Sequence, residues 1–208
     1  MRYLTESLRL ESLPPFRKCT VEECENPRVL DSQFCAHHFG DQTLLRNRVA
    51  ELARVPNGLV GVCLAGADLK GMSLEGADIS YSDLTGADLT DAQLSRAKLS
   101  HVLAESARLD RADLSHAILD FACLGLASCR GTSFEDAVAE NANFIGAVLV
   151  GANFVRARLF YARFGRADCT GAVFRNADIE RTIFRQTRLI EADFGGATGR
   201  AVFDNVIR

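Results

Sequence analysis

The segment Ala142–Phe154 reads ANFIGAVLVGANF, with a large apolar residue at every fifth position. The spacing extends in both directions: steps of five from Leu64 to Gly199 give 28 positions, of which 23 are Leu, Ile or Phe. The residue two places earlier is Ala in 21 of these 28 cases. A period of five fits neither the 3.6-residue repeat of a helix nor the two-residue repeat of a strand. It predicts a solenoid of stacked short repeats.

Single units such as Ala67-Asp68-Leu69, Ala112-Asp113-Leu114 and Ala152-Asn153-Phe154 resemble the A(D/N)LXX unit of the pentapeptide repeat family. The resemblance covers about residues 58–203. It implies an all-β solenoid, a right-handed four-sided β-helix with one quintet on each side and the Ala and Leu/Phe columns inside. We expect about seven coils, stacked roughly 4.8 Å apart like neighbouring strands, in a rod of about 33 Å.

The pattern of the inward residues supports this geometry independently of the resemblance. From Phe134 to Phe194, Phe stands at every second inward position, with smaller residues between. If each quintet forms one side, every coil there carries two rings on opposite sides and two smaller groups on the others. The cross-section of the core then stays constant, as close packing requires.

Composition and charge limit the class of protein. The 208 residues are 48% hydrophobic, without an apolar run long enough to span a membrane and without a start like a signal peptide. We therefore expect a cytoplasmic protein. The net charge of −3 does not indicate nucleic-acid binding. Residues 58–125 carry 10 acidic and 5 basic side chains, whereas residues 126–208 carry 9 acidic and 11 basic, so the rod is polar along its axis.

Residues 1–40 form a separate N-terminal segment with a candidate metal site. Cys19, Cys24, Cys35 and His38 follow the spacing Cys-x4-Cys-x10-Cys-x2-His. Three thiolates and one imidazole complete a tetrahedral Zn²⁺ shell, and this stretch resembles a short zinc knuckle. We predict a structural Zn²⁺ ion. His37 is an alternative fourth ligand, and a loop with incidental thiols remains the alternative to a metal site.

Residues 41–57 are predicted to form a helix and a linker. Leu45, Val49 and Leu52 recur at helical spacing, Leu44 widens the apolar stripe, and residues 55–58 supply a stop. The first coil of a solenoid exposes its core and an unpaired edge. We therefore expect the helix to cap the β-helix of residues 58–208, whereas the alternative is a partner-binding helix.

The repeat slips by one residue near its end, where Phe203 replaces the expected position 204. The last residues, 202–208, are therefore expected to fold over the final coil or to meet a second copy of the chain in a homodimer.

The remaining cysteines indicate free thiols. Cys129 and Cys169 fall in the inward column two coils apart, and Cys63 and Cys123 fall at outward positions three coils apart. Neither pair lies within the separation that a disulfide tolerates, roughly 7 Å between Cα atoms. Free thiols suit a reducing compartment.

The sequence contains no arrangement typical of a catalytic site. His101 and His116 lie on different sides of the predicted rod, and the repeated acidic residues Asp68, Asp78 and Asp88 belong to the repeat unit. A packed rod also lacks a cleft. We therefore expect a protein that is not an enzyme.

A column at one corner of the predicted rod contains several aromatic residues. It reads Tyr81, His101, Phe121, Asn141, Tyr161 and Arg181, with Ile118, Val138 and Phe160 beside it. Such residues could merely stabilise neighbouring coils, as cross-strand pairs do. Together they would also form an apolar strip of the kind that marks an interface. Our candidate partner-binding residues are Tyr81, Ile118, Phe121, Val138, Phe160 and Tyr161.

Two functions follow from these observations. The first is a protein-protein interaction module, a rigid rod that presents one side to a protein partner. The second is implied by the resemblance, because well-understood pentapeptide repeat proteins mimic DNA and protect DNA gyrase and topoisomerase IV from quinolones. The slightly basic C-terminal half departs from that group. We expect no direct contact with nucleic acid.

Overall fold

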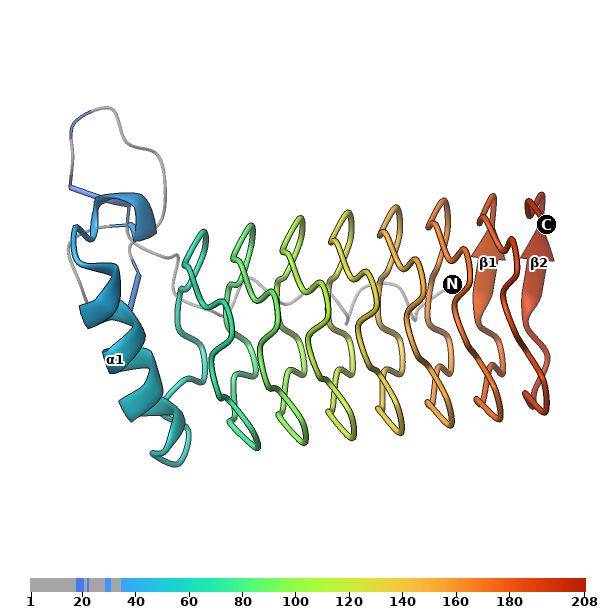
Figure 1. The fold of residues 1–208 in the computed structure, drawn as a ribbon, viewed down its shortest axis with the longest axis horizontal. Helices are drawn as coiled ribbons and strands as arrows, with labels where there is room; N and C mark the ends of the chain where they lie inside the picture. Colours follow the sequence, from blue (N-terminus) through green and yellow to red (C-terminus); the bar gives the residue numbers. More distant parts are fainter. Residues whose placement is uncertain (1–17, 21, 23–28, 31–34) are drawn as a thin grey trace, which may run out of the picture.

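The protein is a rod of stacked coils with one helix across its N-terminal end, as the computed structural model in Figure 1 shows. The structure describes residues 18–20, 22, 29–30 and 35–208. In chain order its elements are η2 (Ala36–His38), α1 (Gln42–Ala53), β1 (Ile183–Arg185) and β2 (Val202–Asp204). Within the described part of the chain, no helix is long and apolar enough to cross a membrane.

Parallel pairing between residues 20 apart builds the rod. Isolated bridges run from Cys63 opposite Asp83 to Asp178 opposite Thr198, with one bridge in each quintet. The amide of each inward residue donates to the next coil, as Leu64 N does to the carbonyl of Asp83 at 2.7 Å. Four quintets therefore make one turn, which confirms the prediction of a β-helix built from five-residue repeats.

The Phe residues fill the C-terminal half of the core as two stacked columns. Phe134, Phe154 and Phe174 stack face to face with centroids 4.6 Å and 5.0 Å apart. The second column, which contains Phe144 and Phe164, meets the first edge to face at 5.6–5.8 Å. Parallel stacking and edge-to-face contact at these centroid distances are favourable for aromatic pairs. The expected alternation of Phe between opposite sides is confirmed.

The Asp or Asn of each unit has a structural role at the corner that follows it. Its side chain accepts a hydrogen bond from the backbone amide two residues later, as Asp88 does from Thr90 at 3.0 Å. Asn153 accepts from Val155 in the same way, also at 3.0 Å. The second residue of each corner has a positive φ, such as 58° at Tyr161. The acceptor side chain thus satisfies a backbone amide that donates no hydrogen bond to a neighbouring coil.

Helix α1 packs on the N-terminal end of the rod. The Asp41 side chain accepts from Leu44 N at 3.0 Å and caps the helix. Leu45 and Val49 are fully buried in the same cluster as Leu59. Leu44, however, is 57% exposed, so its expected place in the apolar stripe is wrong. One residue turns an α-helix by roughly 100°, and this step carries Leu44 off the face that holds Leu45.

The backbone edge of the first coil is covered by segments that precede it. Arg46 of α1 donates to the carbonyls of Asp68 at 3.2 Å and Lys70 at 2.8 Å. Leu30 N donates to the carbonyl of Cys63 at 2.9 Å. These carbonyls have no earlier coil to bond with, so the contacts satisfy part of an edge that would otherwise be open.

Cys63 differs from its expected outward exposure, because its side chain is buried, and its carbonyl accepts the hydrogen bond from Leu30 N. Burial raises the pKa of the Cys63 thiol to about 11. Cys129 and Cys169 are buried in the core as expected, and Cys123 is half-buried. These four cysteines form no disulfide.

The last coil is one residue shorter than the others. Asp178 lies opposite Thr198, 20 residues away, but Ile183 of β1 lies opposite Val202 of β2, 19 residues away. Gly199 stands at the step with φ of 91°, and a Cβ there would lie 2.5 Å from the backbone N of Glu180. The predicted slip is confirmed, and it leaves Gly199 exposed and outside the inward column.

Removal of a core ring should destabilise the protein far more than removal of a corner acid. We expect Phe154→Ala to lower the free energy of unfolding by roughly 3–5 kcal/mol, because the stacked coils cannot collapse into the void. Asp88→Ala, which loses one hydrogen bond and a half-exposed ion pair with Arg108, should cost about 1 kcal/mol. Equilibrium denaturation of both variants measures the difference. Equal costs would show that the inward and outward columns are misassigned.

Candidate metal centre and interaction surface

Three of the four predicted metal ligands lie together beside helix α1. The ligand atoms of Cys19, Cys35 and His38 all lie within 4.8 Å of one another. Each sulfur is 3.5 Å from Nδ1 of His38. Element η2 produces part of this arrangement, because His38 N donates to the carbonyl of Cys35 at 3.1 Å and so brings both side chains onto one turn.

The spacing of these atoms fits a tetrahedral metal ion. With Zn–S bonds of about 2.3 Å and Zn–N bonds of about 2.0–2.1 Å, the S···N edge of a tetrahedron is roughly 3.5 Å long. Both S···N distances in the structure equal this value. The two cysteines are buried, whereas His38 is exposed. A thiolate, thiolate and imidazole set is the donor chemistry that Zn²⁺ prefers.

The rest of the predicted ligand set cannot be placed. Cys24 lies outside the described residues, as does most of the predicted 1–40 segment. Nδ1 of His38 points to both sulfurs, which favours His38 over its neighbour at position 37 as the nitrogen ligand.

The six predicted partner-binding residues gather on one corner of the rod and the side next to it. Tyr81, His101 and Phe121 form a continuous stack, with centroids 4.8 Å and 4.9 Å apart and nearly parallel planes. Tyr81 and Phe121 are exposed, at 45% and 44%. Asn141 interrupts the column, which resumes at Tyr161.

The C-terminal part of this corner combines aromatic and basic groups. Phe160 and Tyr161 meet edge to face at 4.6 Å. The guanidinium of Arg181 lies 5.2 Å from the centroid of the Tyr161 ring and also donates to its hydroxyl. On the adjoining side, Ile118 and Val138 are half-buried and pair as a parallel bridge. We refer to these residues and the stack together as the aromatic corner.

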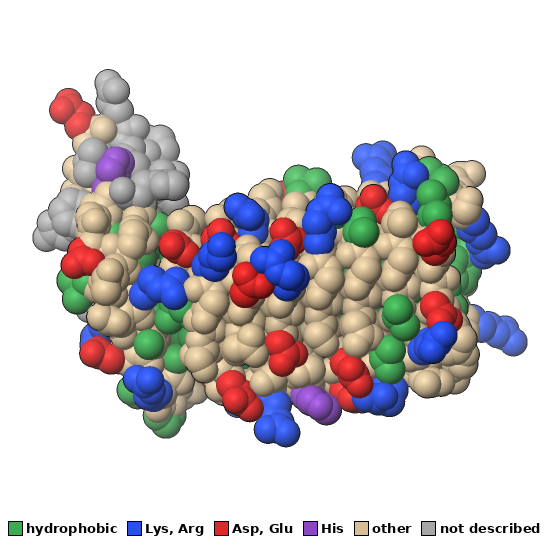
Figure 2. Space-filling model, viewed as in Figure 1, with side chains coloured by type: hydrophobic (Ala, Val, Ile, Leu, Met, Phe, Trp, Pro, Cys, Tyr) green, Lys and Arg blue, Asp and Glu red, His purple; other side chains and the backbone are tan. Residues whose placement is uncertain are grey.

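Many other charged side chains on the surface form ion pairs between neighbouring coils. Figure 2 shows acidic and basic side chains interspersed along the middle of the rod. The pairs connect residues about 20 apart, as in Lys98 with Asp78 at 3.4 Å and Arg111 with Asp91 at 2.8 Å. These pairs were not predicted from the sequence, although opposite charges at a spacing of 20 residues indicate them.

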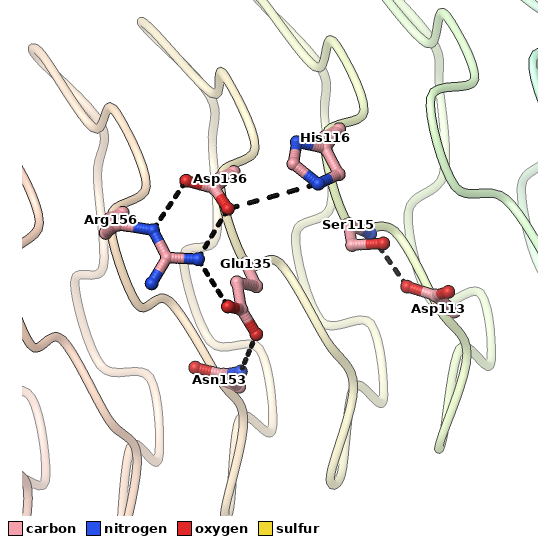
Figure 3. A network of polar contacts seen from close by, with 7 residues as sticks. All are labelled: Asp113, Ser115, His116, Glu135, Asp136, Asn153 and Arg156. Atoms are coloured by element: carbon pink, nitrogen blue, oxygen red, sulfur yellow. Dashed lines mark hydrogen bonds and ion pairs between the residues drawn. The ribbon is translucent and has the colours of Figure 1, made fainter.

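Arg156 lies at the centre of one such network (Figure 3). It donates to Asp136 from Nε at 2.8 Å and from Nη2 at 2.7 Å, and also to Glu135. Glu135 in turn accepts from Asn153 at 3.1 Å, and His116 Nε2 lies 4.0 Å from Asp136. The hydrogen bonds and charge of Arg156, with a smaller effect of His116, hold the pKa of Asp136 below its usual range.

The histidines and repeated acids are accounted for by structural contacts. His101 stacks between Tyr81 and Phe121, and His116 lies beside the Arg156 network on another corner. Asp78 and Asp88 accept from corner amides and face basic residues of the next coil. No general base beside a nucleophile is found in this set.

The match to a family model agrees with the repeats of the fold. The sequence model for pentapeptide repeats (8 copies) matches residues 59–91, 92–127, 127–166 and 167–198. A search of curated proteins finds no match. Among solved structures, the chain is similar to HetL, a pentapeptide repeat protein involved in heterocyst differentiation regulation from the cyanobacterium Nostoc. It is 23% identical to HetL over 70% of this chain and 86% of that chain, with a TM-score of 0.33.

Two further solved structures have sequence identities and TM-scores in a similar range. QnrB1, a plasmid-mediated fluoroquinolone resistance protein, is 20% identical over 71% of this chain and 84% of that chain, with a TM-score of 0.38. A pentapeptide repeat protein from the Arabidopsis thaliana thylakoid lumen is 24% identical over 63% of this chain and 70% of that chain, with a TM-score of 0.25.

The Arg156 network predicts a pH effect. An Asp whose pKa is lowered on folding stabilises the protein above its unfolded pKa of about 3.9, and the contribution is lost as the pH falls through the folded value. We expect Arg156→Gln to raise the pKa of Asp136, because its main hydrogen-bond donor is gone. An NMR titration of the Asp136 carboxyl measures this. Arg158→Gln, which breaks the separate pair with Glu140, should leave that pKa unchanged, and an equal rise there would contradict the assignment.

Proposed function

The chain belongs to the pentapeptide repeat family, and on that premise we propose that it is a non-enzymatic protein-interaction module that presents its aromatic corner to a protein partner. The observation that carries the proposal is the exposed stack of Tyr81, His101 and Phe121. Large apolar side chains along one edge of a rod, with polar residues around them, are typical of a surface that another protein covers.

The backbone at this corner adopts the conformation that is common to the corners of the rod. Tyr81, Phe121 and Tyr161 occupy the corner position with positive φ, at 63°, 59° and 58°. A residue with a side chain is strained there by roughly 1–2 kcal/mol, and non-glycine residues such as Asp91 and Arg96 adopt the same conformation at other corners. Stacking between coils offsets part of this strain. Stacking between coils does not require the rings to stay exposed. The side chain of Tyr161 nevertheless remains 39% exposed, which leaves it available to a partner surface.

The absence of enzymatic activity is part of the same proposal. The interior of the rod is filled by Ala, Leu and Phe, and the acids along its sides are engaged in corner hydrogen bonds and ion pairs. An interaction role needs neither a cleft nor a poised nucleophile.

We assign the N-terminal end of the chain a supporting role. We propose that Cys19, Cys24, Cys35 and His38 bind a structural Zn²⁺ ion, which would fix the segment that covers Cys63. Helix α1 then caps a right-handed rod of about seven coils, since it covers Leu59 and satisfies the carbonyls of Asp68 and Lys70. A metal clip is effective here, because short loops can bury little apolar surface of their own.

Protection of DNA gyrase or topoisomerase IV by DNA mimicry is the second candidate function. The acidic half of the rod favours it, with 10 acidic and 5 basic side chains in residues 58–125. The 11 basic and 9 acidic side chains of residues 126–208 oppose it, since a DNA mimic is negative along its length. A gyrase supercoiling assay with a quinolone, in which the protein is titrated, distinguishes the two functions.

The zinc proposal predicts a stoichiometric metal. Protein purified without a chelator should contain about one Zn²⁺ per chain by elemental analysis. Cys35→Ser should lose it, because the thiolate of a converging donor set is removed. The circular dichroism of the rod should persist, since its coils are held by their own hydrogen bonds and by the stacked Phe columns. Cys123→Ser, far from the site in sequence and half-buried, is the matched control and should retain the metal. Wild-type protein without zinc would rule out the site.

The interface proposal predicts that self-association or partner binding depends on an exposed apolar surface. Light scattering should be compared for the native chain, a chain truncated after Gly199, and Phe121→Glu combined with Tyr161→Glu. Loss of association in the double variant alone assigns it to the aromatic corner. Loss on truncation alone assigns it to the C-terminal end, where Phe203 is 41% exposed.

A charge-matched control carries Gln93→Glu and Ser133→Glu on another side of the rod, and it should behave like the native chain. A native monomer whose partner binding is unaffected by either the corner variant or the truncation would overturn the proposal.

A further inference from the structure

A hollow of about 300 Å³ opens on the surface near the C-terminal end of the rod. Its lining includes Ile145, Arg163, Gly165, Arg166, Ile183 and Arg185. These residues come from consecutive coils, on the side that follows the aromatic corner and on the next corner along the chain.

The hollow exists because Gly165 interrupts a column of larger side chains. The corner position of Gly165 is occupied by Ile145 one coil earlier and by Arg185 one coil later. A Cβ at Gly165 would lie 3.7 Å from both the carbonyl oxygen of Arg185 and Cγ1 of Ile145, which is ordinary van der Waals contact, so a side chain could be added there without a clash. Half-buried Ile183 of β1 supplies a second apolar wall.

Two of the three arginines at this hollow, Arg163 and Arg166, form no ion pair among the described residues, unlike many other arginines of the rod. Arg111 and Arg156 each face an acid one coil earlier, at Asp91 and Asp136. Arg163 instead faces Asn143 and Ile183 across its two bridges. Among the residues that the structure describes, no acid forms an ion pair with it.

Arg166 and Arg185 complete the rim. Arg166 has Gly146 and Gln186 at the neighbouring corner positions, and its Nε donates to the Gln186 side chain at 3.1 Å. This contact holds the guanidinium in place without neutralising it. Arg185 pairs with Asp204 at 2.9 Å. Three arginines and one aspartate therefore leave the rim of the hollow with a net positive charge.

We propose that this hollow binds an acidic segment of the partner protein, whose carboxylates pair with Arg163 and Arg166 and whose apolar side chain sits between Ile145 and Ile183 over Gly165. Guanidinium groups bind carboxylates through paired N–H···O bonds, and such pairs are strongest where one side is desolvated. The inference rests on the proposed interaction function and specifies the chemistry of the partner at a second surface beside the aromatic corner.

An acidic protein segment fits this hollow better than nucleic acid does. The apolar walls and the glycine floor match an aliphatic side chain and have no counterpart in a phosphodiester backbone. Nucleic-acid affinity also depends on many basic groups along an extended track, whereas here the positive charge is confined to one hollow on a chain with a net charge of −3.

The probe for the test is a fluorescein-labelled peptide, Glu-Asp-Leu-Glu-Ile-Asp-Glu, measured by fluorescence anisotropy on the full chain. We expect saturable binding that weakens at least tenfold for Arg163→Glu with Arg166→Glu. Arg130→Glu with Arg200→Glu changes the net charge equally at exposed arginines elsewhere, and it should change the affinity less than twofold. Gly165→Leu should also weaken binding at least tenfold without any change in charge, because its side chain fills the hollow.

Two further probes identify the occupant. A peptide with Ser in place of Leu and Ile should bind at least fivefold more weakly, and a 12-base-pair DNA duplex should not compete. Equal losses in both arginine pairs, an unaffected Gly165→Leu variant that retains its melting temperature, or competition by the duplex would overturn the proposal. If the peptide fails to bind while Phe121→Glu with Tyr161→Glu still abolishes partner binding, the hollow is excluded and the interaction function stands.

Discussion

The parallel register of 20 residues is the constraint on which the rest of this structure depends. Inward residues are hydrogen-bonded to the neighbouring coil and packed against it. Leu64 N donates to the carbonyl of Asp83, and the ring of Phe134 stacks on the ring of Phe154. The contacts between side chains of neighbouring coils follow the same spacing. Rings stack on rings and many opposite charges face each other, because a residue and its twentieth neighbour occupy equivalent places in the coil.

The sequence predicted those parts of the molecule that repeat. The period of five, the two Phe columns and the slip before Phe203 all follow from spacing along the chain, and the structure agrees with each. The exceptions occur where the chain folds back on the repeats. Cys63 was expected to be exposed but is buried where Leu30 bonds to its carbonyl, and Leu44 was placed on a helix face that it does not share. Packing between a repeat and a segment that does not repeat leaves no periodic signal.

The candidate sites divide in the same way. The aromatic corner could be identified from steps of 20 residues, because Tyr81, His101 and Phe121 share one position in the coil. The hollow at Gly165 was not predicted, because its volume depends on how the side chains around the glycine pack, which steps of 20 residues do not show. The convergence of Cys19, Cys35 and His38 was indicated by ligand spacing, but only the fold shows sulfur and nitrogen atoms at the separation of a tetrahedral edge.

The positive φ at the corners has a consequence for how such a protein can change. Nearly every corner of the rod adopts this conformation, whether it holds Gly86, Leu126 or Tyr161. The strain of a side chain there is local, roughly 1–2 kcal/mol, and does not alter the inward columns. Substitutions at the corners are therefore uncoupled from the core. A lineage of such chains can exchange its surface chemistry one position at a time while it keeps one scaffold, so that new partners can be acquired without refolding the rod.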